Sequence, residues 1–294
     1  MIIVQLKGGL GNQLFQYAAA RRLAGKHNTE LKLDLTRYSL GEQRPHAFFS
    51  LDRFDIRAKI AEKAEVLFFH DNTLLGRAVR KIRTITRTGK IKRICERKHF
   101  AFDPAILKLP NNIYLSGYWQ SEKYFKEIED IVREEITLKD AVTSQSIAVE
   151  QEIKSLKNTV SLHIRRGDYV SDIKANNYLG LCPLDYYNKC ISVLGNELGE
   201  LNLFIFSDDL DWVKKNLNTD HQKYFVEHNK TENAHEDIYL MSICEHNIIA
   251  NSSFSWWGAW LNKNKKKKVF APNQWTAKEN CNKLDIVPEE WNRI

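Results

Sequence analysis

Residues 1–18 have the sequence MIIVQLKGGLGNQLFQYA, which contains a strand, a glycine-rich turn and the beginning of a helix. The apolar run 2–6 is typical of a buried strand, and apolar residues at helical spacing follow over 12–27. Asn12 is placed to cap the first turn of that helix. Glycines between a strand and a helix let the backbone approach an anion, which a helix N-terminus attracts. A complete dinucleotide-binding pattern is missing, because Leu14 stands where its third glycine belongs.

The same alternation continues through the chain. Further short apolar runs predict buried strands at 31–35, 113–115, 160–164, 201–206, 248–250 and 269–271. Further helical patterns lie at 121–136, 183–198, 211–217 and 234–244. Strands that alternate with helices indicate parallel sheets with helices on their faces, so we predict the α/β fold class. A polar stretch at 137–156 without a strand signal separates two such sets and predicts two domains, 1–150 and 151–294.

The composition is that of a globular protein, with 294 residues of which 43% are hydrophobic and 28% charged. No apolar run approaches the roughly 18 residues that a membrane-spanning helix needs. The N-terminus has no basic segment followed by a cleavage site, so we expect a cytoplasmic protein. The five cysteines are odd in number and lack CxxC spacing, which argues against a disulfide framework and against a zinc site.

The net charge of +7 is concentrated in one segment. Residues 77–98 contain ten basic side chains against Glu96 alone, so this segment carries +9 and the rest of the chain carries −2. Such a segment favours contact with an anionic surface, and acidic lipids at the inner face of the plasma membrane are the first candidate. A solvated connection inside the N-terminal domain explains the charges equally well. Binding of nucleic acid through this segment is a further alternative, which we do not expect.

A second motif, HIRRGDY at 163–169, follows the predicted strand 160–164. In open α/β sheets, ligands bind beyond the carboxyl ends of the strands. His163, Arg165, Arg166 and Asp168 gather at such an end, and arginine side chains suit phosphates because they donate paired hydrogen bonds. The structural alternative for these four residues is a surface cluster of salt bridges.

Two more motifs follow strands in the C-terminal half. Asp208 and Asp209 end the sequence FSDD, where carboxylates accept hydrogen bonds from a nucleoside, hold a divalent metal, or cap a helix. The sequence NSSFSWWGAW at 251–260 places hydroxyl groups before a helix, which predicts a second anion site. For its three tryptophans, a place in the core for one or two is favoured over stacking on a ligand.

Taken together, these segments resemble the bacterial α-1,2-fucosyltransferases, relatives of the α-1,6- and protein O-fucosyltransferases. The match covers nearly the whole chain in order. Its motifs are GGLGNQLFQYA, HIRRGDY, FSDD and NSSFSWWGAWL, with GYWQSEKYF at 117–125 and APNQW at 271–275 as weaker echoes. The resemblance implies a GT-B architecture, in which two Rossmann-like domains face each other across a cleft. It assigns the acceptor to domain 1–150 and the donor, GDP-L-fucose, to domain 151–294.

The resemblance also implies an inverting transfer of L-fucose to the 2-hydroxyl of a terminal galactose on an oligosaccharide or on a surface glycan such as an O-antigen, without a cofactor or a metal. By family position, Arg165 contacts the diphosphate, and Asp168 either orients Arg165 or acts as the base. The expected catalytic residues are His163, Arg165 and Asp168. The expected donor-binding residues are Gly9, Gly11, Asn12, Arg166, Asp208, Asp209, Asn251, Ser252, Ser253, Phe254 and Ser255. The expected acceptor-binding residues are Tyr118, Trp119 and Gln120.

Two other classes of function are compatible with parts of the sequence. A non-catalytic glycan-binding protein would explain the aromatic residues but not two separate anion sites at strand ends. A nucleic-acid binder would use residues 77–98, and its affinity would fall steeply with salt.

Overall fold

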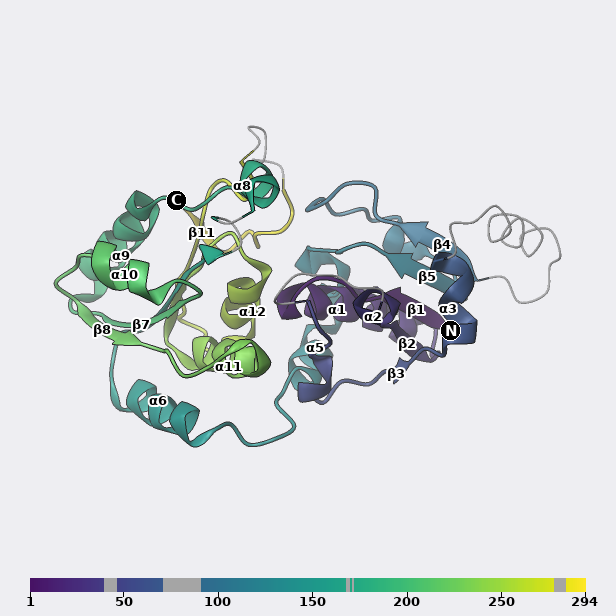
Figure 1. The fold of residues 1–294 in the computed structure, drawn as a ribbon, viewed down its shortest axis with the longest axis horizontal. Helices are drawn as coiled ribbons and strands as arrows, with labels where there is room; N and C mark the ends of the chain where they lie inside the picture. The colour runs from purple at the N-terminus through teal and green to yellow at the C-terminus, as the bar shows by residue number, and fades with distance from the viewer. Residues whose placement is uncertain (40–46, 71–90, 168–169, 171, 278–283) are drawn as a thin grey trace. The chain divides into compact units, whose positions relative to one another are not determined.

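The computed structural model describes residues 1–39, 47–70, 91–167, 170, 172–277 and 284–294. It contains two compact units, Met1–Lys139 (unit 1) and Asp140–Ile294 (unit 2), each with its own parallel sheet (Figure 1). The division lies within the predicted separating stretch, but before residue 150, because helix α6 (Ser144–Ser155) belongs to unit 2. Thr143 caps α6 and also donates its backbone N–H and its hydroxyl to Glu236 Oε2, at 3.1 and 2.8 Å. A boundary after residue 150 would therefore cut through α6.

The sheet of unit 1 has the strand order β3-β2-β1-β5-β4. Its strands are β1 (Ile2–Gln5), β2 (Leu31–Asp34), β3 (Lys59–Ile60), β4 (Lys92–Cys95) and β5 (Ile113–Ser116). All neighbours are parallel, and in the central register Ile2 lies beside both Leu31 and Ile113. The carboxyl ends of the strands therefore meet at one edge of the sheet, where parallel α/β folds bind their ligands.

Helices cover this sheet. They are α1 (Leu10–Lys26), α2 (Thr36–Ser39), α3 (Lys63–His70) and α5 (Glu129–Glu135), with short 3-10 helices at Leu51–Arg53, Ile106–Lys108, Glu122–Tyr124 and Lys126–Ile128. Helix α3 packs Val66 and Phe69 against Ile3 and Tyr114 of the sheet. The rings of Phe69 and Tyr114 stack with their centroids 3.9 Å apart.

The sheet of unit 2 has the order β11-β10-β9-β6-β7-β8, again with parallel neighbours. Its strands are β6 (Thr159–Ile164), β7 (Asn202–Ser207), β8 (Gln222–Phe225), β9 (His246–Ile248), β10 (Val269–Ala271) and β11 (Asn292–Arg293). Its helices besides α6 are α8 (Ile173–Leu179), α9 (Leu184–Leu198), α10 (Leu210–Asn216), α11 (Ala234–Ile243) and α12 (Ser253–Leu261), with a 3-10 turn at Thr231–Asn233.

The two faces of the unit 2 sheet have different partners. Val160, Leu162 and Ile164 of β6 share a core with α9 and α10. The residues between them point to the other face, because successive side chains of a strand alternate. There Ser161 accepts a hydrogen bond from Asn247 at 2.7 Å, and the ring of His163 lies 5.7 Å from that of Phe254 in α12.

The predicted α/β fold class and the favoured place of tryptophans in the core are confirmed, and two local expectations are corrected. The helix expected at 121–136 is interrupted at Phe125 and Ile128, whose φ angles of −136° and −119° are not helical. Asn12 is not the cap of α1, which begins one turn earlier from Gly9. Trp256, Trp257 and Trp260 are all buried, and Trp256 also contacts the ring of Trp291.

No helix in the part of the chain that the structure describes is long and apolar enough to cross a membrane. Most of the basic segment, residues 77–90, lies outside the described residues. Its described part, residues 91–98, contains β4, an edge strand of unit 1 with exposed Lys92 and Arg93.

Candidate active site

The motif that follows β6 places two arginines at the carboxyl edge of the unit 2 sheet. Arg165 Nη1 forms an ion pair with Asp208 Oδ2 at 2.9 Å, and Asp208 comes directly after β7, the neighbouring strand. The other carboxylate oxygen of Asp208 accepts the backbone N–H of Arg166 at 2.8 Å. Asp208 therefore joins the ends of β6 and β7 and holds the guanidinium group of Arg165 in place. The Arg165 side chain is 18% exposed.

Gly167 makes this close approach possible. A Cβ atom at this position would lie 2.4 Å from Asp208 Oδ2, which is closer than real atoms approach. Glycine is therefore required here for the contact between the HIRRGDY segment and Asp208.

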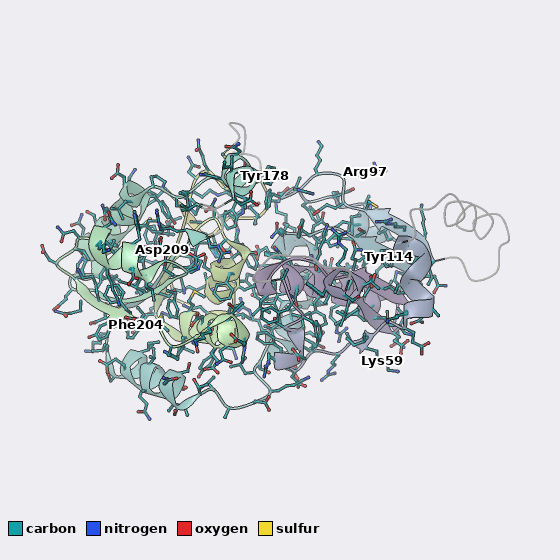
Figure 2. All side chains as sticks on the ribbon, in the orientation of Figure 1. Lys59, Arg97, Tyr114, Tyr178, Phe204 and Asp209 are labelled. Carbon is teal, nitrogen blue, oxygen red and sulfur yellow. The ribbon has the colours of Figure 1, made fainter. Side chains whose placement is uncertain are left out.

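A second pair lies beside the first. Arg166 Nε donates to Asp209 Oδ2 at 3.1 Å, and the Arg166 guanidinium carbon lies 3.6 Å from the centre of the Trp212 ring, a cation–π contact. Asp209, labelled in Figure 2, also caps α10 by accepting the backbone N–H of Trp212 at 3.2 Å. The expected nucleoside contacts, Asp208 and Asp209, thus hold the two arginines, and Asp209 also has the capping role that the sequence left open.

His163 lies under this cluster and is 4% exposed. Burial lowers the pKa of His163 to about 4, the nearby Asp208 carboxylate opposes this shift, and the Arg165 charge adds to it. Its Nδ1 atom is buried and has no hydrogen-bond partner. A neutral imidazole with so low a pKa is a weak base, so His163 is poorly suited to accept a proton.

Helix α12 brings its N-terminus to the neighbouring strand end. Ser252 caps the helix by accepting the Phe254 backbone N–H at 3.3 Å. Ser255 is buried, and its hydroxyl donates to the Ser252 carbonyl at 3.4 Å, whereas Ser253 and Phe254 are half-buried. The predicted arrangement of hydroxyl groups before a helix is present, and Ser253 and Phe254 are its more accessible members.

Asn251 supports this segment from inside. Its side-chain NH₂ donates to the carbonyls of Leu179, Gly180 and Trp275 at 3.0, 3.1 and 3.3 Å. Because these bonds connect the start of α12 to two other loops, the structure gives Asn251 a role in shaping the site.

The glycine-rich loop of unit 1 is held by glutamine side chains of α1. Gln16 accepts the backbone N–H of Lys7 and donates to its carbonyl, at 3.0 and 3.1 Å. Gln13 donates to the Gly8 carbonyl at 3.2 Å, and Gly8 adopts a φ of +75°, which favours glycine. Gly9 is half-buried at the start of α1, whereas Gly11 is buried in the first turn.

The expected acceptor-binding residues lie at the end of β5, in the same unit. Gln120 is buried and donates to Asn12 Oδ1 at 2.8 Å, so it joins two expected site residues. Trp119 is also buried. Tyr118 is half-buried, and the Lys7 ammonium lies 4.2 Å from the centre of its ring.

The structure adds residues that the sequence motifs did not single out. Glu96 accepts the backbone N–H groups of Tyr118 and Trp119, both at 2.8 Å. In unit 2, burial raises the pKa of Asp237 to about 7, and Asn229 donates to this carboxylate at 2.7 Å. The only sequence signal for Asp237 is a run of titratable residues, His235 to Asp237, at the start of a helix.

Two expectations are left without a structural test. Asp168 lies outside the described residues. Among the described residues, no group of three or more His, Cys, Asp or Glu side chains is arranged to hold a metal ion.

The whole chain, residues 1–294, matches the family model described as glycosyl transferase family 11. The chain belongs to this family. An α-1,2-colitosyltransferase of Escherichia coli is 36% identical over 100% of this chain and 99% of its own length. A galactoside 2-α-L-fucosyltransferase of Caenorhabditis elegans is 26% identical over 100% of this chain and 79% of its own length.

The family 11 chain also resembles a solved structure. This is a mutant of Arabidopsis thaliana FUT1 in complex with GDP, with a TM-score of 0.51 and 12% identity over 94% of this chain and 71% of that one. The likeness confirms the GT-B fold class that the motifs predict. The resemblance stated from the sequence is confirmed as well, because family 11 is the α-1,2-fucosyltransferase family.

Proposed function

We propose that this family 11 glycosyltransferase transfers L-fucose from GDP-L-fucose to the 2-hydroxyl of a galactose in a surface glycan, with inversion at the fucose anomeric carbon. The observation that carries the proposal is the Arg165–Asp208 ion pair at the carboxyl end of β6, inside the motif shared with the fucosyltransferases. A fixed guanidinium at a strand end is suited to a diphosphate leaving group.

The chemistry of the transfer explains why such a group is needed. As the bond between fucose C1 and the diphosphate breaks, negative charge grows on the departing phosphate, and the acceptor 2-hydroxyl attacks C1 from the opposite side. Arg165, together with backbone N–H groups at the start of α12, would stabilise that charge. The hydroxyl proton must leave as well, and Asp168 is the candidate base from the motif.

We also propose that no cofactor and no metal takes part, because Arg165 can supply the positive charge that a metal would otherwise supply. Activity should therefore survive EDTA. Complete loss of activity in EDTA, with recovery on addition of Mg²⁺ or Mn²⁺, would refute this part of the proposal.

Transfer of colitose is the second candidate, because the relative at 36% identity is named as a colitosyltransferase. Colitose is fucose without its 3-hydroxyl, so both donors need the same diphosphate contact. A site that hydrogen-bonds the 3-hydroxyl would discriminate strongly against colitose, whereas a site without this contact would accept both sugars.

The deciding experiment compares GDP-fucose and GDP-colitose, each with lactose and with other β-galactosides. We expect release of GDP and a product whose linkage NMR shows α-1,2-attached fucose. Binding of galactosides without release of GDP would instead favour the non-catalytic glycan-binding alternative.

Substitution of Arg165 tests the mechanism. Arg165→Ala should lower kcat by about 100-fold or more while the protein stays folded, because removal of one preorganised donor to a developing charge typically slows a reaction by this factor. Arg165→Lys should recover little, because an ammonium cannot replace the paired N–H groups. Lys215→Ala, an exposed cation in the same unit, is the control that should keep full activity.

A further inference from the structure

A cluster of polar side chains lies at the carboxyl edge of the unit 1 sheet. It consists of Lys7, which follows β1, Glu96 and His99, which follow β4, and Tyr118, which follows β5. These strands are neighbours in the order β1-β5-β4. We call these four residues the unit 1 cluster. Among them, only Tyr118 was expected from the sequence to contact a substrate.

Glu96 gives the cluster its shape. The Glu96 side chain is 4% exposed, and its two carboxylate oxygens accept the backbone N–H groups of Tyr118 and Trp119 at 2.8 Å each. A Cβ atom at Gly117 would lie 2.4 Å from the Glu96 Cβ, so the two loops approach closely only because residue 117 is glycine. A buried carboxylate bonded in this way fixes the loop after β5 to the loop after β4.

The backbone of both loops is strained at corresponding places. Phe100, directly after His99, has a φ of +60°, and Trp119, directly after Tyr118, has a φ of +55°. This region is unfavourable for bulky side chains, and such conformations persist only where the surroundings impose them. They concentrate at sites that bind ligands, because there the strain fixes the orientation of neighbouring groups.

The orientation fixed here brings three different groups together. The Lys7 ammonium lies 4.2 Å from the centre of the Tyr118 ring, and the His99 ring meets Tyr118 edge-on at 5.7 Å. His99 Nε2 lies 3.9 Å from Glu96 Oε2, and the His99 side chain is 47% exposed. An aromatic ring beside an imidazole and an ammonium offers both a surface for sugar C–H groups and hydrogen bonds for sugar hydroxyls.

We infer that the unit 1 cluster is a subsite for the acceptor sugar, with His99 and Tyr118 in contact with the galactose ring and Glu96 as the positioning residue. The inference rests on the proposed function, because that function supplies a galactoside as the acceptor. It also changes the set of acceptor residues expected from the sequence. Trp119 and Gln120 are buried and support the site, whereas Lys7 and His99 join Tyr118 on its surface.

Initial rates on the full chain, with GDP-fucose and lactose, test the inference. His99→Ala and Tyr118→Ala should each raise the acceptor KM about three- to tenfold, the value of one hydrogen bond or ring contact. The donor KM, measured from the slow hydrolysis of GDP-fucose without acceptor, should not change. Glu96→Gln should also raise the acceptor KM alone, because an NH₂ group replaces one of the two oxygens that each accept a backbone N–H group.

Lys59→Ala is the matched control. Lys59 lies in β3, at the opposite edge of the same sheet from β4, and its side chain is 75% exposed. In Figure 2, Lys59 and Arg97, a neighbour of the cluster, lie on opposite sides of unit 1. This variant should leave both KM values unchanged.

The outcomes separate this inference from the proposed function. If the wild-type protein transfers fucose but His99→Ala and Tyr118→Ala change the acceptor KM by less than about twofold, or raise the donor KM equally, the inference is wrong and the function stands.

If the wild-type protein transfers nothing, saturation-transfer NMR with lactose decides. A signal that is lost in His99→Ala supports the subsite, whereas no signal in the wild type or an equal signal in the variant overturns it. If Glu96→Gln does not fold, the His99→Ala result decides.

Discussion

Asp208 is the residue whose role differs most between sequence and structure. The sequence suggests a contact to the nucleoside, whereas the carboxylate forms an ion pair with Arg165 and accepts the backbone N–H of Arg166. A residue that only orients Arg165 acts on the transition state more than on donor binding.

We therefore predict that Asp208→Asn lowers kcat by about tenfold or more and leaves the donor KM unchanged or lower. The amide keeps one oxygen for the Arg166 N–H but removes the charge that fixes Arg165. Asp209→Asn should have a smaller effect, because Asp209 holds Arg166 and not Arg165. Steady-state kinetics with varied GDP-fucose measure both parameters. A raised donor KM at unchanged kcat would instead restore the nucleoside contact.

His163 makes the stability of unit 2 depend on pH. Because burial lowers the pKa of His163 to about 4, the unfolded chain, with a histidine pKa of about 6.5, binds a proton that the native protein does not. Stability is therefore lost as the pH falls from about 6.5 towards about 4, by about 2 kcal/mol at pH 5. Urea unfolding at pH about 7 and about 5 should show this loss in the wild type and a smaller one in His163→Gln. An equal loss in both proteins would contradict the assignment.

The residues that sequence alone could place are those in dense motifs. Two neighbouring strands are followed by Arg165 and Arg166 and by Asp208 and Asp209. The structure brings these residues into contact, as expected for side chains at the carboxyl ends of parallel strands. Glu96 could not be found in this way. It stands in a basic run, and its importance comes from two backbone N–H groups more than twenty residues later in the chain.

Among the strands too, some could be predicted from the sequence and others could not. All seven strands expected from apolar runs are present within one or two residues of their predicted limits, because each is buried on both faces. The four strands that were not predicted, β3, β4, β8 and β11, are the edge strands of the two sheets. Edge strands are half exposed and therefore carry polar residues, as KRIC in β4 and QKYF in β8 show.

Substitution by alanine should change the stability of the protein in opposite directions at two helical glycines. In α12, a Cβ atom at Gly258 would lie 2.6 Å from the Met241 Cβ of α11, so Gly258→Ala should destabilise the protein by about 1–3 kcal/mol through overpacking. In α1, a Cβ atom at Gly25 would meet only Arg21 Nη1, at 3.2 Å, whereas Nε and Nη2 of the same guanidinium hold Glu135. Gly25→Ala should therefore stabilise the protein by about 0.5–1 kcal/mol. Urea unfolding of both variants measures the difference, and equal shifts would refute the packing argument.

At the scale of the whole molecule, the distribution of charge distinguishes one segment from the rest. Residues 77–98 carry +9 on a chain whose remainder carries −2, and we propose that acidic lipids are the partner of this segment. Reversal of four charges outside the described residues, Arg80, Lys81, Arg83 and Arg87 to Glu, should abolish co-sedimentation with anionic liposomes at low salt. Fucose transfer to lactose should survive. Wild-type protein that does not co-sediment would leave the segment as a solvated connection.

The packing of tryptophans in unit 2 has a spectroscopic consequence. Of the seven tryptophans in the chain, Trp119 alone belongs to unit 1, and the clustered indoles of Trp256, Trp257, Trp260 and Trp291 lie in unit 2. Fluorescence excited in the indole band therefore follows the melting of unit 2 almost by itself, without any attached dye. If GDP binds unit 2, its addition should raise the melting temperature that tryptophan fluorescence reports. The melting temperature from circular dichroism, which reports on both sheets, should rise less.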